Sequence, residues 1–234
     1  MNELAIHALP KGFRASGISA KIKSSGAKDL ALIVNDGPAC FGTATFTSNQ
    51  VVAAPVIWSH QIIRDQQVRA VLLNSGGANA CTGPEGFADT HKSAELVAQA
   101  LGISSSDVGI CSTGLIGIRL PMEKIEEGIT EAINSLSSSG LHDAAQAIMT
   151  TDSKPKISSL QFNDTTTVGI AKGAGMLAPS LATMLSVIMT DATFDANLAT
   201  EIFHEVCEKT FNRIDSDGCT STNDTVFFLS SGAS

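Results

Sequence analysis

Short runs of apolar and β-branched residues predict several β-strands along the chain. Residues 29–36, 40–48 and 68–74 have strand length, and an Asp-Gly-Pro turn joins the first two runs. Residues 165–171 and 185–189 have the β-branched or apolar composition of buried strands. These runs indicate a sheet-containing fold with a buried core.

Apolar residues at helical spacing predict two helices. One follows Pro121, because proline is favoured in a first helical turn, and its apolar positions are Met122, Ile125, Ile129, Ala132, Ile133 and Leu136. The other spans residues 196–211, with one side formed by Leu198, Ile202, Phe203, Val206 and Thr210. Residues 135–140 (SLSSSG) are predicted to form a surface loop. Strands mixed with helices predict an α/β or α+β fold, with the topology left open.

Composition narrows the functional class. The 234 residues are 43% hydrophobic and 16% charged, which is typical of a globular chain with its own core and excludes disorder. No apolar run approaches the roughly 18 residues of a membrane span. The net charge of −8, the absence of Tyr and the single Trp argue against nucleic-acid binding.

The cysteines and the N-terminal segment predict a cytoplasmic protein. None of the five cysteines forms a Cys-x-x-Cys pair, so neither a zinc ribbon nor a redox pair is indicated, and we expect reduced thiols. The N-terminal segment MNELAIHALPKGFRASG lacks the apolar core of a signal peptide. A reducing cytoplasm is therefore the expected location.

Several glycine-rich and acidic segments lack the spacing of known ligand sites. Residues 74–83 (NSGGANACTG) contain no P-loop pattern, and residues 173–175 lack the third glycine of a dinucleotide fingerprint. Residues 215–218 begin like a calcium loop, but Val226 occupies the place of the bidentate glutamate. The five histidines are scattered, and no G-x-S-x-G motif is present. These patterns predict neither a metal site nor a hydrolase serine.

The most informative segment is residues 171–192, AKGAGMLAPSLATMLSVIMTDA. Lys172, two glycines and Pro179 precede Ala182, a small residue that is followed directly by Thr183. This segment resembles the autocleavage site of the ornithine acetyltransferase family, the bifunctional glutamate N-acetyltransferases of arginine biosynthesis. Further blocks resemble the family in family order, at residues 10–17, 28–36, 74–83, 112–125, 149–156 and 211–225. The resemblance covers essentially the whole chain.

The resemblance implies an αββα sandwich like that of self-processing N-terminal-nucleophile hydrolases. Residues 1–182 would form the α-chain region, and residues 183–234 would begin the β-chain region, both within one intertwined domain. Cleavage between Ala182 and Thr183 would free the α-amine of Thr183, whose reference pKa of about 7.7–8.0 suits a base for its own hydroxyl. The family assembles as a heterotetramer of two α and two β chains.

The family also implies roles for other residues. The Thr113 hydroxyl and the Gly114 N–H would form the oxyanion hole, Lys172 would bind a substrate carboxylate, and Thr150 or Thr151 would add a hydrogen bond. Without the family, residues 111–117 are a strand end running into a glycine turn, and a lysine such as Lys172 is typical of a surface.

The implied reaction moves an acetyl group from N2-acetylornithine to glutamate through an acetyl-Thr183 ester. No metal or prosthetic group is expected, and some family members also use acetyl-CoA as donor. Gly77 departs from the pattern, since the family usually has Asn there. Family chains also continue well beyond residue 234, so we expect the C-terminal part of the substrate pocket to be missing. Two alternatives stay open: a self-processing threonine aminopeptidase of related fold, and an inactive fragment of the acetyltransferase.

Overall fold

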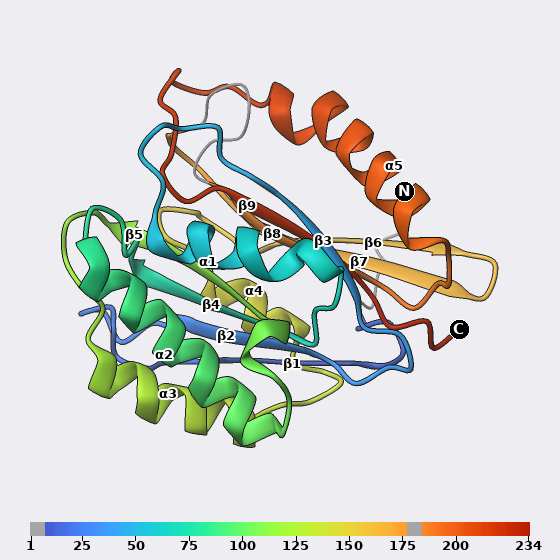
Figure 1. Ribbon diagram of the computed structural model, residues 1–234, viewed down its shortest axis with the longest axis horizontal. Coiled ribbons are helices and arrows are strands. Elements are labelled where there is room, and N and C mark those ends of the chain that lie inside the picture. The colour runs from blue at the N-terminus through green and yellow to red at the C-terminus, as the bar shows by residue number, and fades with distance from the viewer. Residues whose placement is uncertain (1–7, 177–183) are drawn as a thin grey trace.

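Two β-sheets face each other in the computed structural model, which describes residues 8–176 and 184–234 (Figure 1). The first sheet has the order β1-β2-β4-β5. Its strands are β1 (Phe13–Ile18), β2 (Leu30–Asn35), β4 (Ala70–Gly77) and β5 (Val108–Leu115). The β1–β2 and β2–β4 pairs are antiparallel, whereas β4 and β5 are parallel.

The second sheet has the order β3-β9-β8-β7-β6. Its strands are β3 (Phe41–Phe46), β6 (Lys156–Phe162), β7 (Thr165–Lys172), β8 (Leu185–Thr190) and β9 (Thr225–Ser230). Only the β8–β9 pair is parallel. Strands β8 and β9, from the last part of the chain, therefore lie between β3 and β7, from the earlier part.

Helices cover the outer faces and the edges of the two sheets. Figure 1 shows α2 and α3 on the first sheet and α5 over the second. The smaller helices α1 and α4 each contact both sheets. The helices are α1 (Ala54–Ile62), α2 (Gly83–Leu101), α3 (Met122–Asn134), α4 (Leu141–Ala147) and α5 (Ala196–Lys209), with 3-10 turns at Ile63–Asp65, Ser105–Asp107 and Phe211–Arg213. This arrangement confirms the αββα prediction. None of the helices in the described ranges is long and apolar enough to span a bilayer.

A single core joins the facing sheets. Side chains of the first sheet, such as Leu73 and Ile110, belong to the same buried cluster as Val187 and Phe227 of the second. Gly109 permits the close approach, because a Cβ there would lie 2.7 Å from Cζ of Phe227. The two sheets therefore hold each other in a fixed relation.

The strands and helices predicted from the sequence are confirmed, with one correction that concerns the apolar side of α5. Residues 29–36 and 40–48 form β2 and β3, but these strands belong to different sheets, because the chain crosses over at Gly37. The predicted apolar side of residues 196–211 is divided. Phe203 is buried together with Cys207, because this side of α5 packs on β9 and Met184, whereas Leu198, Ile202 and Val206 are about half exposed.

Candidate active site

Strand ends from both sheets meet near the segment that precedes β8. Lys172, the last residue of β7, pairs with Leu185, the first residue of β8. Leu185 pairs in turn with Thr225 at the start of β9. Thr113 lies near the end of β5 in the opposite sheet. The topology thus gathers residues that are far apart in the sequence.

The Lys172 side chain connects the two sheets. Its Nζ donates a hydrogen bond to the Thr113 Oγ1 at 3.0 Å, and both residues are buried, with 1% and 3% of their surface exposed. Because the ammonium group occupies a lone pair of the Thr113 oxygen, the Thr113 hydroxyl proton is directed elsewhere. This contact turns Thr113 into a hydrogen-bond donor for another group, which an oxyanion hole requires.

Two carboxylates partly compensate the positive charge of the buried Lys172 side chain. Burial lowers the pKa of Lys172 to about 8, although Asp152 and Asp224 oppose that shift. Burial raises the pKa of the Asp152 carboxyl, but Lys156 and the backbone N–H groups of Gly173 and Thr150 outweigh burial and lower it overall. The Gly173 N–H lies 2.9 Å from Asp152 Oδ1, so the loop after α4 is tied to the end of β7.

Asp224 is fully buried immediately before β9. Its Oδ1 accepts a hydrogen bond from the Met184 N–H at 2.8 Å. Burial raises the pKa of Asp224 to about 7, while that N–H, the nearby Ser221 hydroxyl and Lys172 lower it. The residue that follows Thr183 is therefore fixed by a carboxyl group.

Gly114 and the two threonines of the predicted pocket line one cavity of about 530 Å³. Thr150 and Thr151 are exposed at its rim, and Lys23 lies beside them. Gly114 has a φ of +134°, a conformation that L-residues with side chains rarely adopt. The structure therefore brings Gly114, Thr150 and Thr151 together around open space, with the Thr113–Lys172 pair buried next to Gly114.

Ala182 and Thr183, the predicted cleavage site and nucleophile, lie outside the described residues. The described residues on either side of this segment are both bound by carboxylates. The Met176 N–H lies 2.7 Å from Asp217 Oδ2, and the Met184 N–H is bound by Asp224. Both carboxylates come from the segment just before β9.

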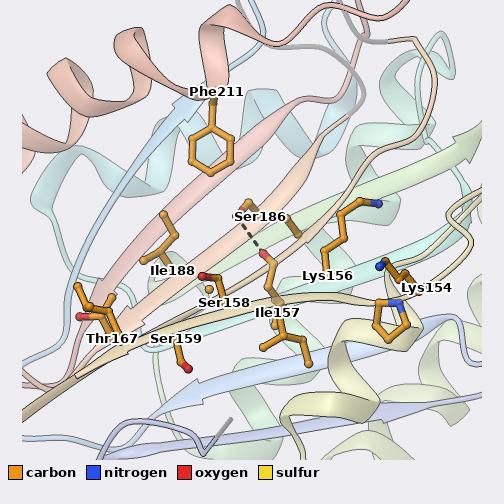
Figure 2. A pocket seen from close by; sticks show the side chains of 14 residues that line it. Lys154, Lys156, Ile157, Ser158, Ser159, Thr167, Ser186, Ile188 and Phe211 are labelled. Carbon is orange, nitrogen blue, oxygen red and sulfur yellow. Dashed lines mark hydrogen bonds between the residues drawn. The ribbon is translucent and has the colours of Figure 1, made fainter. Parts of the chain in front are cut away.

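A larger cavity, of about 670 Å³, lies on the opposite face of the second sheet. Figure 2 shows Phe211 directed toward this face and the hydrogen bond from Ser186 Oγ to the Ile170 carbonyl. Ala171 and Ser186 line this cavity, whereas the neighbouring Lys172 points between the sheets toward Thr113. Successive residues of a strand face opposite sides, so this cavity is separate from the candidate site.

Three site residues were not predicted from the sequence: Asp152, Asn223 and Asp224. The Asn223 Nδ2 donates to the carbonyl oxygens of Ala78 and Ser112, at 2.6 and 2.9 Å, and so ties the start of β9 to the first sheet. All three residues lie within the blocks at 149–156 and 211–225 that carried the family resemblance. The signal in the sequence that could have identified them was a polar side chain close to the end of a predicted strand.

The fold is that of a two-sheet α/β protein with helices outside the facing sheets. A solved serine aminopeptidase from Ochrobactrum anthropi, described as a variant of the Ntn hydrolase fold, matches with a TM-score of 0.54. It covers 94% of this chain and 72% of its own, at 11% sequence identity, so that likeness concerns the fold alone.

Within this class, the chain belongs to the ArgJ family, whose model matches residues 14–234. A Streptomyces coelicolor relative named arginine biosynthesis bifunctional protein ArgJ is 54% identical over 96% of this chain. The chain spans 58% of that relative's length. A solved ornithine acetyltransferase from Mycobacterium tuberculosis, complexed with ornithine, is 52% identical with a TM-score of 0.73, covering 76% of this chain and 97% of its own.

Proposed function

We propose that this chain carries the self-cleaving part of an ornithine acetyltransferase of arginine biosynthesis. The enzyme would transfer an acetyl group from N2-acetylornithine to glutamate through an acetyl-Thr183 intermediate. The observation that carries the proposal is the Lys172–Thr113 hydrogen bond, at 3.0 Å, because Lys172 pairs in the sheet with Leu185, two positions after Thr183. Membership of the ArgJ family and the names of the relatives support the same reaction.

The cleavage is an N→O acyl shift followed by hydrolysis. The Thr183 Oγ attacks the Ala182 carbonyl carbon, the bond from that carbon to the Thr183 nitrogen breaks, and the hydroxyl proton ends on the nitrogen. Water then hydrolyses the resulting ester and regenerates the Thr183 hydroxyl. Both steps develop negative charge on a carbonyl oxygen, which the Thr113 hydroxyl and the Gly114 N–H would stabilise.

The extent of the related crystal chain supports cleavage at this position. The match with the solved Mycobacterium tuberculosis chain covers 76% of this chain and 97% of that one, so the solved chain is about three quarters as long as this one. Cleavage before Thr183 would leave an N-terminal piece of similar relative length. The curated Streptomyces coelicolor relative is much longer than the solved chain, as shown by the fact that this whole chain spans 58% of its length.

The transfer then proceeds in two halves. The Thr183 Oγ, with its α-amine as base, attacks the acetyl carbonyl of N2-acetylornithine, and ornithine leaves as its nitrogen takes a proton. The glutamate amine attacks the acetyl-Thr183 ester, giving N-acetylglutamate and the free hydroxyl. Lys172 would bind a substrate carboxylate, and Thr150 or Thr151, at the rim of the 530 Å³ cavity, would add a hydrogen bond.

The remaining features of the proposal follow the family. Acetyl-CoA would be a second acetyl donor, no metal or prosthetic group would take part, and the enzyme would work in the cytoplasm. Two copies of each cleaved piece would form a heterotetramer. The proposed partners are small amino-acid substrates rather than nucleic acid or membrane.

Intact-mass measurement of the purified chain tests the cleavage. We expect two fragments that separate between Ala182 and Thr183, and a single uncut chain for Thr183→Ala, which lacks the attacking hydroxyl. A single mass for the unaltered chain would contradict self-cleavage, and a cut Thr183→Ala variant would place the scissile bond elsewhere.

An assay with N2-acetylornithine and glutamate tests the transfer. Formation of N-acetylglutamate by the cleaved chain, and its loss in Thr113→Val, would support the acetyltransferase. Cleaved protein that instead releases amino acids from short peptides would favour the threonine aminopeptidase. Cleaved protein without either activity would favour the inactive fragment.

A further inference from the structure

Lys23 is the one charged residue among the described residues that line the 530 Å³ cavity beside Gly114. The proposed reaction gives this lysine no role. Four side chains with hydroxyl groups line the same cavity: Ser24, Ser25, Thr150 and Thr151. Hydroxyl groups can donate hydrogen bonds, and an ammonium group forms stronger ones to an anion. A cation among hydroxyl groups, with no carboxylate among the described lining residues, is the chemistry of an anion-binding site.

Two backbone carbonyls and strand β4 fix the Lys23 side chain beside the proposed oxyanion turn. Its Nζ donates hydrogen bonds to the carbonyl oxygens of Lys28 at 3.0 Å and of Met149 at 2.7 Å. A Cβ added to Gly76 would lie 3.3 Å from Cγ of Lys23, and Gly76 pairs with Gly114 in the sheet. The lysine stem therefore passes close to this turn. Because an ammonium group has three N–H donors, one donor remains after the two carbonyl bonds.

The positive charge of Lys23 is not neutralised by an ion pair within the described part of the chain. Burial lowers the pKa of Lys23, although the charges of Asp29 and Asp152 oppose that shift. Lys172 has a different setting, because it is only 1% exposed and is not one of the residues that line this cavity. Lys23 is therefore the cation that a ligand in this cavity would contact.

We propose that Lys23 binds the side-chain carboxylate of glutamate and thereby selects the acetyl acceptor. This inference rests on the proposed function, in which glutamate takes the acetyl group from Thr183. Glutamate has two carboxylates, whereas N2-acetylornithine has one carboxylate and an ammonium group at the end of its side chain. With Lys172 assigned to one carboxylate, the second carboxylate of glutamate calls for a second cation. The same positive charge repels the side-chain ammonium of the donor.

Binding of glutamate and glutamine to the full chain tests this role, because glutamine has nearly the same shape without the second charge. Isothermal titration calorimetry compares the unaltered chain with Lys23→Met and with a control, Lys21→Met. Lys21 lies in the same segment, is exposed, and is not one of the residues that line the cavity. The unaltered chain and Lys21→Met should bind glutamate about tenfold more tightly than glutamine, because hydrogen bonds between charged groups contribute that much. Lys23→Met should bind the two ligands equally.

The transfer assay supplies a readout that a merely structural role would not give. Lys23→Met should raise KM for glutamate about tenfold and should not raise KM for N2-acetylornithine. A purely structural defect would impair both substrates together. Lys23→Gln keeps an N–H donor for the two carbonyl oxygens but loses the charge, so this variant decides the matter if Lys23→Met does not fold by circular dichroism.

The outcomes separate this inference from the proposed function. A folded Lys23→Met or Lys23→Gln that still prefers glutamate to glutamine would overturn the role of Lys23 alone. An unaltered chain that binds neither ligand, or both equally, would do the same. Because binding does not require cleavage, an unaltered chain that prefers glutamate through Lys23 but is never cut would overturn the proposed self-cleavage and support the Lys23 site.

Discussion

Substitution of Gly114 by alanine tests the proposed oxyanion turn, at residues 113–117, because an added Cβ would collide with main-chain atoms. A Cβ at this position would lie 2.5 Å from the Gly76 carbonyl carbon and 2.6 Å from the Gly77 nitrogen. These are backbone atoms of β4, so they cannot rotate away as a side chain could. The φ of +134° adds strain of about 1–3 kcal/mol, and the overpacking adds about 1–3 kcal/mol. Gly114→Ala should therefore lower the free energy of unfolding by about 2–6 kcal/mol.

Gly117 provides the matched control in the same turn. Its φ is +84°, but a Cβ there would meet nothing within 4 Å. Gly117→Ala therefore carries only the conformational cost, about 1–2 kcal/mol. The difference between the two variants isolates the collision with β4.

Urea unfolding followed by the fluorescence of Trp58, the single tryptophan, measures both variants. Intact mass and the acetyl-transfer assay measure function. A displacement of the turn by about 1 Å should slow cleavage and transfer about 100-fold in Gly114→Ala, whereas Gly117→Ala should keep most of its activity. Variants equal in stability within about 0.5 kcal/mol, with Gly114→Ala fully active, would refute an oxyanion turn packed on β4.

Two further predictions concern burial. Unaltered protein should gain stability relative to Lys172→Met between about pH 8 and 10.5, because the folded lysine releases its proton over a range in which the unfolded lysine keeps it. The full gain is about 3 kcal/mol, and a pH-independent difference in urea unfolding would contradict it. On α5, Phe203→Ala should lower the free energy of unfolding by about 3–5 kcal/mol, because the Phe203 side chain is only 6% exposed. Ile202→Gln should lower it by less than about 0.5 kcal/mol, because Ile202 is 49% exposed. Equal losses of thermal stability in the two variants would contradict this account of the helix face.

The sequence predicts which residues form strands more reliably than which strands pair with one another. The apolar run at residues 29–36 is a strand in any buried setting, and it forms β2. The turn after β2, however, leads into the other sheet, because Gly37 packs directly against Ser231 and Asn35 Nδ2 donates to the Ser230 carbonyl. These contacts join opposite ends of the sequence, and no local pattern reveals them. The sequence also does not predict the long helix α2, because its buried face consists largely of small and polar residues such as Gly86, Thr90 and Ser93.

The candidate site was predictable in its residues but not in its contacts. Thr113, Gly114 and Lys172 were selected through blocks of sequence, and the structure brings them together. Asp152 and Asp224 were not selected, because a carboxylate beside a strand end has no distinctive spacing. Their importance comes from burial next to Lys172, which only the packing of the two sheets creates. That burial also bears on the proposed role of Lys172, because its ammonium group already donates one hydrogen bond to Thr113.

Cleavage before Thr183 would divide the second sheet between two polypeptides without dividing the core. Strands β8 and β9 would belong to the C-terminal piece and β3, β6 and β7 to the N-terminal piece, yet β8 borders β7 and β9 borders β3. Val187 and Phe227, both fully buried, would stay in the common core, and each such side chain contributes about 1.5–3 kcal/mol. Met184, the second residue of the C-terminal piece, would keep its hydrogen bond to Asp224 at the entrance to β8. One broken peptide bond would then leave a sheet that two polypeptides share, because the contacts that join its strands do not depend on that bond.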